Sequence, residues 1–488
     1  MFIIKKKLHL LSTITSIALL SGALQANEPE VRSAIKANGQ MVYFEKQKKA
    51  NSLTDMLKEG NFYGRLRNNN FYFWYDDSTS NTHFISGLGA SLVYKSADYN
   101  GFDFTIAGYG ARAFFSETQD NVNTIKAGKD LFSRFNYVNT GSKSLYTFAQ
   151  ANIAYKISKT KLIAGRQLVE TFYTKSNDTK MIPNSFDGVV IESKDIQDSK
   201  LKVAYLAKQK LRDHQDSHSV LMYGDASSSS SIHPEWNQND DSAMHKGLTY
   251  TALSTAGKST SAPLIVLDFQ NNSVKDLQIN FASYVVPELL SQTMGEVNYN
   301  MNLGGFSVTP GVRYIHQFDN GAGAVGGASL TGSTSGYKSP NSLKADMIAA
   351  RIVTKIDDYK INLGYTNILD KADLVTPWRG FPTAGYTRSM GIYNWRANTK
   401  SYRLELVKGD NKTGIYKNGF FQTSVLYVDG DKTKSESDKM FYYFGYIKNL
   451  ASAPQFQYRF RLGYNDYIKD DKTKTDFIDS RLELNYTF

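Results

Sequence analysis

Apolar and polar side chains alternate along the last stretch of this sequence, and that alternation restricts its fold more than any other feature. Over residues 478–488 the apolar side chains share one parity, and polar or charged residues hold the other. Successive side chains of a β-strand point to opposite faces, so a period of two predicts a strand with one apolar and one polar face. The pattern returns at 295–303, 402–406 and 456–465, which predicts an all-β protein.

The alternation predicts 18 strands, joined by connections of two length classes. The expected strands cover 61–75, 84–96, 102–115, 145–157, 161–168, 187–194, 200–208, 262–270, 276–286, 295–303, 306–318, 346–355, 359–368, 401–409, 419–428, 440–448, 455–468 and 476–488. The long connections fall at 116–144, 209–261, 319–345 and 369–400, and the others are short. Long loops at one end, short turns at the other and apolar faces rich in Tyr and Phe are typical of bacterial outer-membrane barrels. We therefore expect a transmembrane antiparallel β-barrel of about 18 strands rather than a soluble β-sandwich.

Composition removes several other classes of protein. The chain has no Cys, which excludes disulfide frameworks, Cys nucleophiles and Cys-ligated metals. Its mean hydropathy of −0.41 excludes a protein built of many membrane-spanning helices. Its 28 Phe and 32 Tyr are too many aromatic residues for a disordered chain.

The first residues have the form of a secretory signal peptide. Lys5, Lys6 and Lys7 precede a short apolar run, which small residues at Ala23 and Ala26 follow. We expect residues 1–26 to be a signal peptide, 27–60 a lead or a small plug in the barrel mouth, and 61–488 the transmembrane barrel. We expect no strand within 27–60, but a short helix that begins near Ser52.

The fifth expected strand and the connection after it resemble a known family. The strand ends in Gly165-Arg166-Gln167, and residues 176–188 read SNDTKMIPNSFDG. This resembles the OprD family of outer-membrane porins, whose third extracellular loop has the form S-D-x-R-x-x-P-x-S-F-x-G, with Lys180 here in place of the usual Arg. The residues at 233–236 and 239–242 are similar to those of ε-proteobacterial members.

That resemblance implies a barrel whose third loop, expected at 169–186, folds into the lumen as a constriction. The motif residues that would form it are Asp178, Lys180, Pro183, Ser185, Phe186 and Gly188. The resemblance also implies a row of basic side chains, here called the basic ladder, that guides small carboxylate-bearing solutes.

Placing the polar parity of each strand in the lumen gives the members of this ladder. The pore-facing basic residues are then Arg65, Arg67, Arg313, Arg351, Arg403, Arg459, Arg461 and Arg481. A last hairpin centred near Asp471 puts Arg461 opposite Arg481 and Arg459 opposite Glu483, and the second pair is expected to form a salt bridge. The alternative is that these arginines only pair with wall carboxylates or bind lipopolysaccharide at the rim.

These observations predict a porin of the Gram-negative outer membrane that passes small hydrophilic solutes by diffusion and favours anionic ones. We expect no catalysis, cofactor, metal or nucleic acid. The expected partners are membrane lipid, lipopolysaccharide, the solutes and the outer-membrane assembly machinery, which would recognise Phe488; monomer and homotrimer both stay open.

Two other functions are weighed against the porin. The long loops are long enough for a surface adhesin or receptor. An omptin-like barrel protease is suggested by Asp213-His214 and Asp240-Asp241, but such an enzyme needs its two pairs on opposite walls and here both lie in one expected loop.

Overall fold

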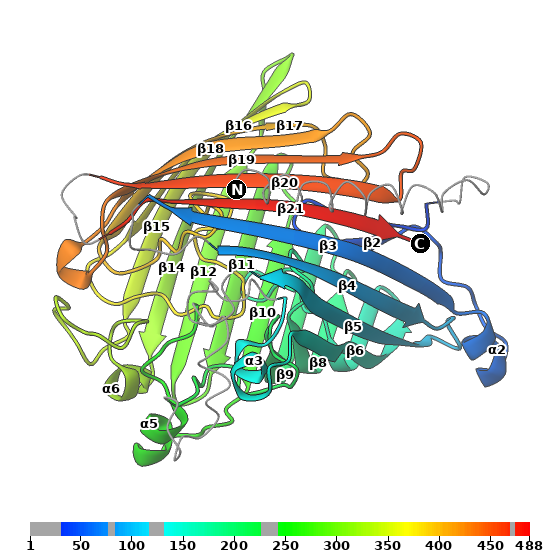
Figure 1. Cartoon of the computed structure of the whole chain (residues 1–488), viewed down its shortest axis with the longest axis horizontal. Helices are drawn as coiled ribbons and strands as arrows, with labels where there is room; N and C mark the ends of the chain where they lie inside the picture. The colour runs from blue at the N-terminus through cyan, green and yellow to red at the C-terminus, as the bar shows by residue number, and fades with distance from the viewer. Residues whose placement is uncertain (1–30, 77–82, 117–130, 226–242, 469–473) are drawn as a thin grey trace, which may run out of the picture.

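The computed structural model describes residues 31–76, 83–116, 131–225, 243–468 and 474–488 (Figure 1). The expected signal peptide and the pair Asp240-Asp241 lie outside these residues. None of the described helices is long and apolar enough to cross a membrane.

The described strands from Asn61 to Thr487 close into one antiparallel barrel, in which β21 pairs with β3. The barrel has 18 strand positions. Strands β12 and β13 both pair with β14 and count as one position, since they are two parts of a single strand that is interrupted at Asn300. The strands are β3 (Asn61–Tyr75), β4 (His83–Lys95), β5 (Phe102–Ser116), β6 (Ser144–Ile157), β7 (Thr160–Gln167), β8 (Ser185–Ser193), β9 (Ser199–Lys210), β10 (Leu264–Asn271), β11 (Leu277–Val286), β12 (Leu290–Tyr299), β13 (Met301–Asn302), β14 (Phe306–Asp319), β15 (Ala345–Ile356), β16 (Tyr359–Ile368), β17 (Thr399–Lys408), β18 (Phe420–Asp429), β19 (Lys439–Asn449), β20 (Phe456–Tyr467) and β21 (Phe477–Thr487). The predicted fold class is confirmed.

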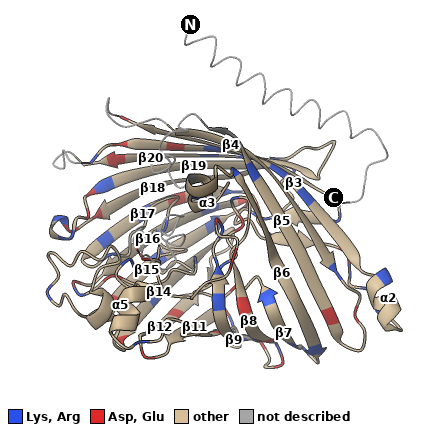
Figure 2. Ribbon diagram, turned by 60° about the horizontal axis from the view of Figure 1, so that its bottom comes forward, with Lys and Arg blue, Asp and Glu red and all other residues tan. Residues whose placement is uncertain are grey.

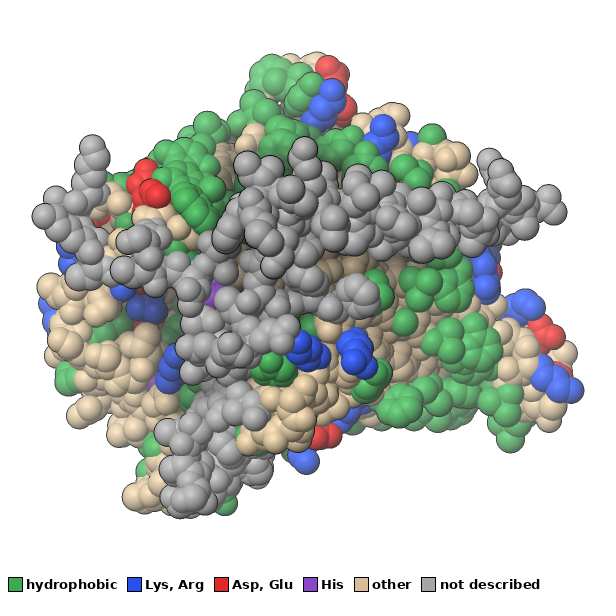
Figure 3. Space-filling view, in the orientation of Figure 1, with side chains coloured by type: hydrophobic (Ala, Val, Ile, Leu, Met, Phe, Trp, Pro, Cys, Tyr) green, Lys and Arg blue, Asp and Glu red, His purple; other side chains and the backbone are tan. Residues whose placement is uncertain are grey.

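The strand alternation has the polarity of a membrane barrel. On β17, Tyr402 and Leu404 are 46% and 54% exposed, whereas Arg403 between them is 6% exposed. Apolar side chains therefore face outward and charged ones face the lumen, as a lipid-facing wall requires. In Figure 3, hydrophobic side chains cover much of the visible wall, and charged side chains gather at the end formed by α2.

The four expected long connections are long in the structure as well. We name three of them by their order among the connections at the end of the barrel that carries the long loops: loop four (211–263), loop six (320–344) and loop seven (369–398). Helices α3 (Arg134–Thr140), α5 (Tyr250–Thr255), α6 (Ala322–Gly326) and the 3₁₀ turn η2 (Lys432–Lys434) lie in connections at this end. Helix α2 (Leu53–Lys58) lies at the other end, as Figures 1 and 2 show.

The tenth strand departs from its prediction. It begins at Leu290 rather than at 295, after a turn of only three residues, 287–289. Leu290 and Met294 are buried while Ser291 and Thr293 lie on the outer face. The same parity faces inward along the whole of β12, but here the inward side chains are apolar because they pack in the core formed with the loops, so an alternation that assumes a polar lumen misses this segment.

Residues 33–43 also differ from expectation, since they form a β-hairpin of β1 (Ser33–Ile35) and β2 (Met41–Tyr43). The hairpin contacts inward-facing residues of the wall: Gln457 donates to the carbonyl of Ile35, and Thr487 donates to the carbonyl of Ser33. The short helix α2 begins as predicted, with the Ser52 hydroxyl accepting from the backbone N–H of Asp55 at 3.0 Å.

The loops fill much of the lumen with an apolar core. Trp378 and Trp395 of loop seven are fully buried, and the indole N–H of Trp378 donates to the carbonyl of Val220 in loop four at 2.7 Å. They pack with inward-facing residues of β8 to β16 in one hydrophobic cluster. This packing leaves the remaining lumen near β17 to β21 and β3.

Candidate constriction and basic cavity

The segment between β7 and β8, residues 168–184, lies inside the barrel, and we call it loop three. Its apolar side chains Met181 and Ile182 pack in a buried cluster with inward-facing residues of β3 to β6. Two walls hold its backbone: Asn69 on β3 donates to the carbonyl of Lys180 at 2.9 Å, and Lys210 on β9 donates to that of Pro183 at 3.1 Å. Loop three is therefore anchored across the lumen, as the family resemblance implied.

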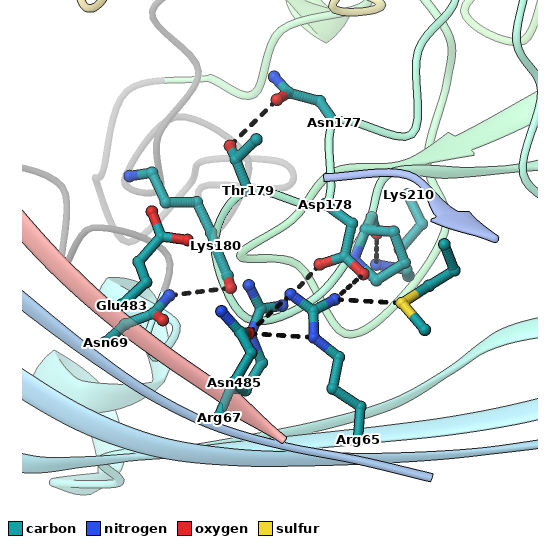
Figure 4. A network of polar contacts seen from close by, with 12 residues as sticks. Arg65, Arg67, Asn69, Asn177, Asp178, Thr179, Lys180, Lys210, Glu483 and Asn485 are labelled. Carbon is teal, nitrogen blue, oxygen red and sulfur yellow. Dashed lines mark hydrogen bonds and ion pairs between the residues drawn. The ribbon is translucent and has the colours of Figure 1, made fainter. Parts of the chain in front are cut away.

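At the tip of loop three, Asp178 binds two members of the expected ladder. Its Oδ2 lies 2.9 Å from Nη1 of Arg65, and its Oδ1 lies 2.6 Å from Nη1 of Arg67 (Figure 4). Arg65 also donates through Nη2 to Asn485 on β21 at 3.0 Å. All three charged side chains are almost fully buried, so this pairing is a strong one in a region of low dielectric.

The other expected constriction residues divide into two groups. Lys180 places its ammonium group 4.7 Å from the ring centre of Phe71, within the lumen, and Pro183 belongs to the loop backbone. Ser185, Phe186 and Gly188, in contrast, belong to β8. Gly188 packs so closely on β9 that a Cβ there would lie 2.1 Å from the carbonyl oxygen of Tyr205. These three residues are part of the wall, because β8 begins earlier than the predicted 187.

Loops three and seven and the wall of β17 to β21 enclose a cavity of about 540 Å³, which we call the basic cavity. The charged residues that line it are Lys180, Arg212, Arg379, Arg388, Arg403, Arg461, Arg481 and Asp479. Seven cationic side chains therefore face it with one carboxylate among the described residues. Aromatic residues complete the lining, among them Phe381 and Tyr393 of loop seven.

A smaller space of about 250 Å³, the lower cavity, lies between loop three and the β1–β2 hairpin. Its described charged lining consists of Lys36, Lys95, Glu170 and Asp178, two of each sign. Asn177, Thr179 and Lys180 line the basic cavity while Asp178 lines the lower one, so the tip of loop three separates the two spaces.

The structure distributes the eight expected ladder arginines over three places. Arg403, Arg461 and Arg481 line the basic cavity, and Arg65 and Arg67 hold Asp178. The remaining three, Arg313, Arg351 and Arg459, hold other segments of the chain.

Arg313 and Arg351 fix loop seven to the wall. Arg313 pairs with Glu296 and donates to the carbonyls of Pro382 and Ala384 at 2.7 and 2.9 Å. Arg351 donates to the carbonyl of Gly385 at 3.0 Å. For these two arginines the contacts fit the alternative interpretation, in which the arginines pair with wall carboxylates, better than they fit a ladder that binds solutes.

The register of the last hairpin agrees with the sequence analysis, but the expected Arg459–Glu483 salt bridge is absent from the contacts of the described residues. Arg461 is paired with Arg481 and Arg459 with Glu483 across β20 and β21. Glu483 instead binds the guanidinium of Arg461, on the diagonal. Arg459 donates to the carbonyl of Ala37 at the tip of the β1–β2 hairpin. The predicted Arg459–Glu483 salt bridge is wrong because Arg459 binds this hairpin, which the sequence analysis did not expect.

Three cationic residues of the basic cavity lie on loops and were missed by strand parity: Arg212, Arg379 and Arg388. Arg388 lies 4.5 Å from the ring centre of Phe381 and 5.2 Å from that of Tyr393. Burial lowers the pKa of Arg388 to about 10, so it stays charged at neutral pH. The available sequence signal was the density of aromatic residues and arginines in 378–396.

Two other groups of residues lie away from this site. Arg166 pairs with Asp187 at 2.6 Å near the loop end of the barrel, and neither lines the basic cavity. Asp213 and His214, suggested for the protease alternative, are buried with His214 Nε2 and Asp213 Oδ1 3.9 Å apart. Their suggested partners fall outside the described residues.

Comparisons with known proteins agree with this geometry. A family model for "outer membrane porin, OprD family" matches residues 127–369. The fold is similar to that of OccK8 (OprE) of Pseudomonas aeruginosa, with a TM-score of 0.66, 15% identity and coverage of 89% of this chain and 99% of that one. It is similar to OccAB4 of Acinetobacter baumannii at a TM-score of 0.65 and 14% identity, covering 88% and 98%. OpdK of Pseudomonas aeruginosa, solved with vanillate, gives 0.64 and 12%, also covering 88% and 98%. No curated protein matches the sequence significantly.

Proposed function

Because this chain belongs to the OprD family of outer membrane porins, we propose that it passes small hydrophilic solutes across the outer membrane and favours those that carry a carboxylate. The observation that carries the proposal is the basic cavity, where seven cationic side chains and one carboxylate of the described residues face the same 540 Å³ space. A solute that crosses the barrel beside loop three passes through this charged space.

The chemistry of the lining suits carboxylates. A guanidinium offers two parallel N–H donors that match the two oxygens of a carboxylate. Arg461 and Arg481 present such groups from the neighbouring strands β20 and β21, Arg403 presents one from β17, and Arg388 presents one from loop seven. Several weak sites in sequence let a solute enter and still leave, which conduction requires.

The partners of the wall arginines limit how tightly an anion is held. Arg461 binds Glu483, Arg403 binds Glu405, and Arg481 binds Asp479 at 2.6 Å. Each pairing offsets part of the positive charge, so the cavity attracts an anion through its net charge rather than through one unpaired cation. Such a field supports flux rather than tight binding.

A structural neighbour supports the choice of solute class. The solved structure of OpdK contains vanillate, the anion of an aromatic carboxylic acid. Phe381, Tyr393 and Tyr443 line the basic cavity here beside its arginines. An aromatic carboxylate could contact both kinds of side chain, and its ring would gain from stacking on them.

Swelling of proteoliposomes tests this function. Gluconate and glucose are close in size but differ in charge, and glucosamine supplies the cation. We expect the purified, refolded protein to admit gluconate faster than glucose, and glucose faster than glucosamine. Equal rates for all three would leave a porin without the proposed preference, and no swelling in any of them would contradict a solute channel altogether.

A further inference from the structure

The contact between loop three and β3 has the form of a bound solute. The two oxygens of Asp178 each accept from a different guanidinium, Oδ2 from Arg65 at 2.9 Å and Oδ1 from Arg67 at 2.6 Å (Figure 4). Arg65 and Arg67 lie two residues apart on β3, so their side chains share the lumen face. A carboxylate on a solute would use the same donors in the same way.

This carboxylate is held in place by the chain on both sides. After it, the carbonyl of Lys180 accepts from Asn69 at 2.9 Å. Beneath it, Gly39 at the turn of the β1–β2 hairpin is so close that a Cβ would lie 2.5 Å from the carbonyl oxygen of Asp178. Gly39 has a φ of +86°, a conformation that suits glycine and brings the turn against loop three.

The site still has donors for another acceptor. Within the part of the chain that the structure describes, Nε and Nη2 of Arg67 have no hydrogen-bond partner, although Arg67 is only 3% exposed. Buried donors without a partner cost free energy, and a second acceptor would recover it. Arg67 therefore can bind a solute oxygen in addition to Asp178 or in its place.

We propose that Asp178 is a built-in competitor for the carboxylates that this channel passes. It occupies Arg65 and Arg67 as a solute would, and a permeating carboxylate exchanges with it at the step from the basic cavity to the lower cavity. Asp178 thereby shortens the time that an anion stays at the tip of loop three. This inference rests on the proposed function, because it concerns carboxylates in transit.

The charges on the two sides of loop three support this role. The basic cavity has a large excess of cationic side chains, whereas the described lining of the lower cavity has two cations and two carboxylates, one of which is Asp178. An anion drawn into the basic cavity thus leaves toward a region of balanced charge. Release there depends on Asp178 returning to its arginines.

Single-channel recording of the full refolded chain tests the inference, with benzoate as the probe that blocks KCl current. Asp178→Asn removes the charge and keeps the side-chain shape. Asp195→Asn is the matched control, because it makes the same substitution at a carboxylate in the turn between β8 and β9, which accepts from Ser158 and lines neither cavity. Asp178→Ser, also uncharged, replaces the first variant if that does not insert.

We expect Asp178→Asn to lengthen benzoate blocks about threefold and to raise the ratio of chloride to potassium permeability, while Asp195→Asn behaves as the wild type. Unchanged or shorter blocks in Asp178→Asn would overturn the inference and show that Asp178 only pins the loop. An anion preference in the wild type would then still support the proposed function. If the wild type shows no anion preference but the blocks are still longer in Asp178→Asn, the result would support the competitor and contradict the proposed function.

Discussion

Arg461 and Arg481 are directly paired across β20 and β21, yet each guanidinium has a carboxylate of its own. Arg461 binds Glu483, and Arg481 binds Asp479 through two contacts, Nε to Oδ1 at 2.9 Å and Nη2 to Oδ2 at 2.6 Å. Two like charges can therefore stand side by side on the wall of the basic cavity. Replacing either arginine alone would leave a buried carboxylate without its partner, which is strongly destabilising.

Arg388 is the better residue for testing the charge of the basic cavity. Its side chain contacts the carbonyl of Ile392 and the rings of Phe381, Tyr393 and Trp395, so Arg388→Gln removes a charge without leaving an ion pair broken among the described contacts. We expect the variant to lower the ratio of anion to cation permeability about twofold. Reversal potentials in a salt gradient measure this ratio.

The matched control for that variant removes one charge of each sign. Arg461→Gln combined with Glu483→Gln eliminates a buried pair and leaves the net charge of the lumen unchanged. Its permeability ratio should stay near that of the wild type. A drop in the control as large as that in Arg388→Gln would mean that particular side chains, and not net charge, set the selectivity.

Shortening loop three should widen the channel. Removing residues 177–182 takes away the tip that separates the basic cavity from the lower one, so single-channel conductance should rise. Removing residues 256–260 of loop four, which line neither cavity, is the control and should leave conductance unchanged. An inserted channel that lacks 177–182 and conducts as the wild type does would show that loop three does not limit the flow.

The packing of loop four on loop six should weaken in acid. Burial lowers the pKa of His245 to about 4, below the 6.5 of the free side chain. Its Nδ1 accepts from the backbone N–H of Gly247 at 3.1 Å and its Nε2 lies 3.0 Å from the carbonyl of Gly327, so the neutral ring donates through Nε2.

The sign of this effect follows from the two pKa values. Between pH 6.5 and about 4 the opened state binds a proton that the packed state excludes, so the contact is fully stable above that window and loses up to about 3 kcal/mol as pH falls through it. Hydrogen exchange of residues 243–248 should accelerate over this range. In His245→Gln the exchange should depend less on pH.

Phe488 offers a test of assembly. Its backbone exchanges two hydrogen bonds with Gly64, at 2.8 and 3.0 Å, and its ring covers Gly64 on the outer wall. We propose that the assembly machinery recognises this ring, so Phe488→Ala should lower the amount of inserted protein and leave the conductance of each channel unchanged. Phe306→Ala, which removes another exposed Phe near the same rim, is the control and should insert normally.

The sequence was informative where the wall meets lipid, because there the environment of each residue depends on strand parity alone. The alternation around Arg403 predicted β17, and the pairing of Arg461 with Arg481 followed from the position of the last turn. Parity fails where the chain packs on itself inside the lumen. The β1–β2 hairpin binds Arg459, and loop seven places Arg388 in the lining of the basic cavity. Both arrangements depend on contacts between segments that are far apart in sequence.

The central claim is that the lumen selects anions through the excess of cationic side chains around the basic cavity. The reversal potential of the wild-type channel in a KCl gradient at neutral pH tests it most directly, because Arg388 and the other arginines are charged there. We predict a potential whose sign shows chloride crossing more readily than potassium. A potential of zero, or one of the opposite sign, would contradict this account of the channel.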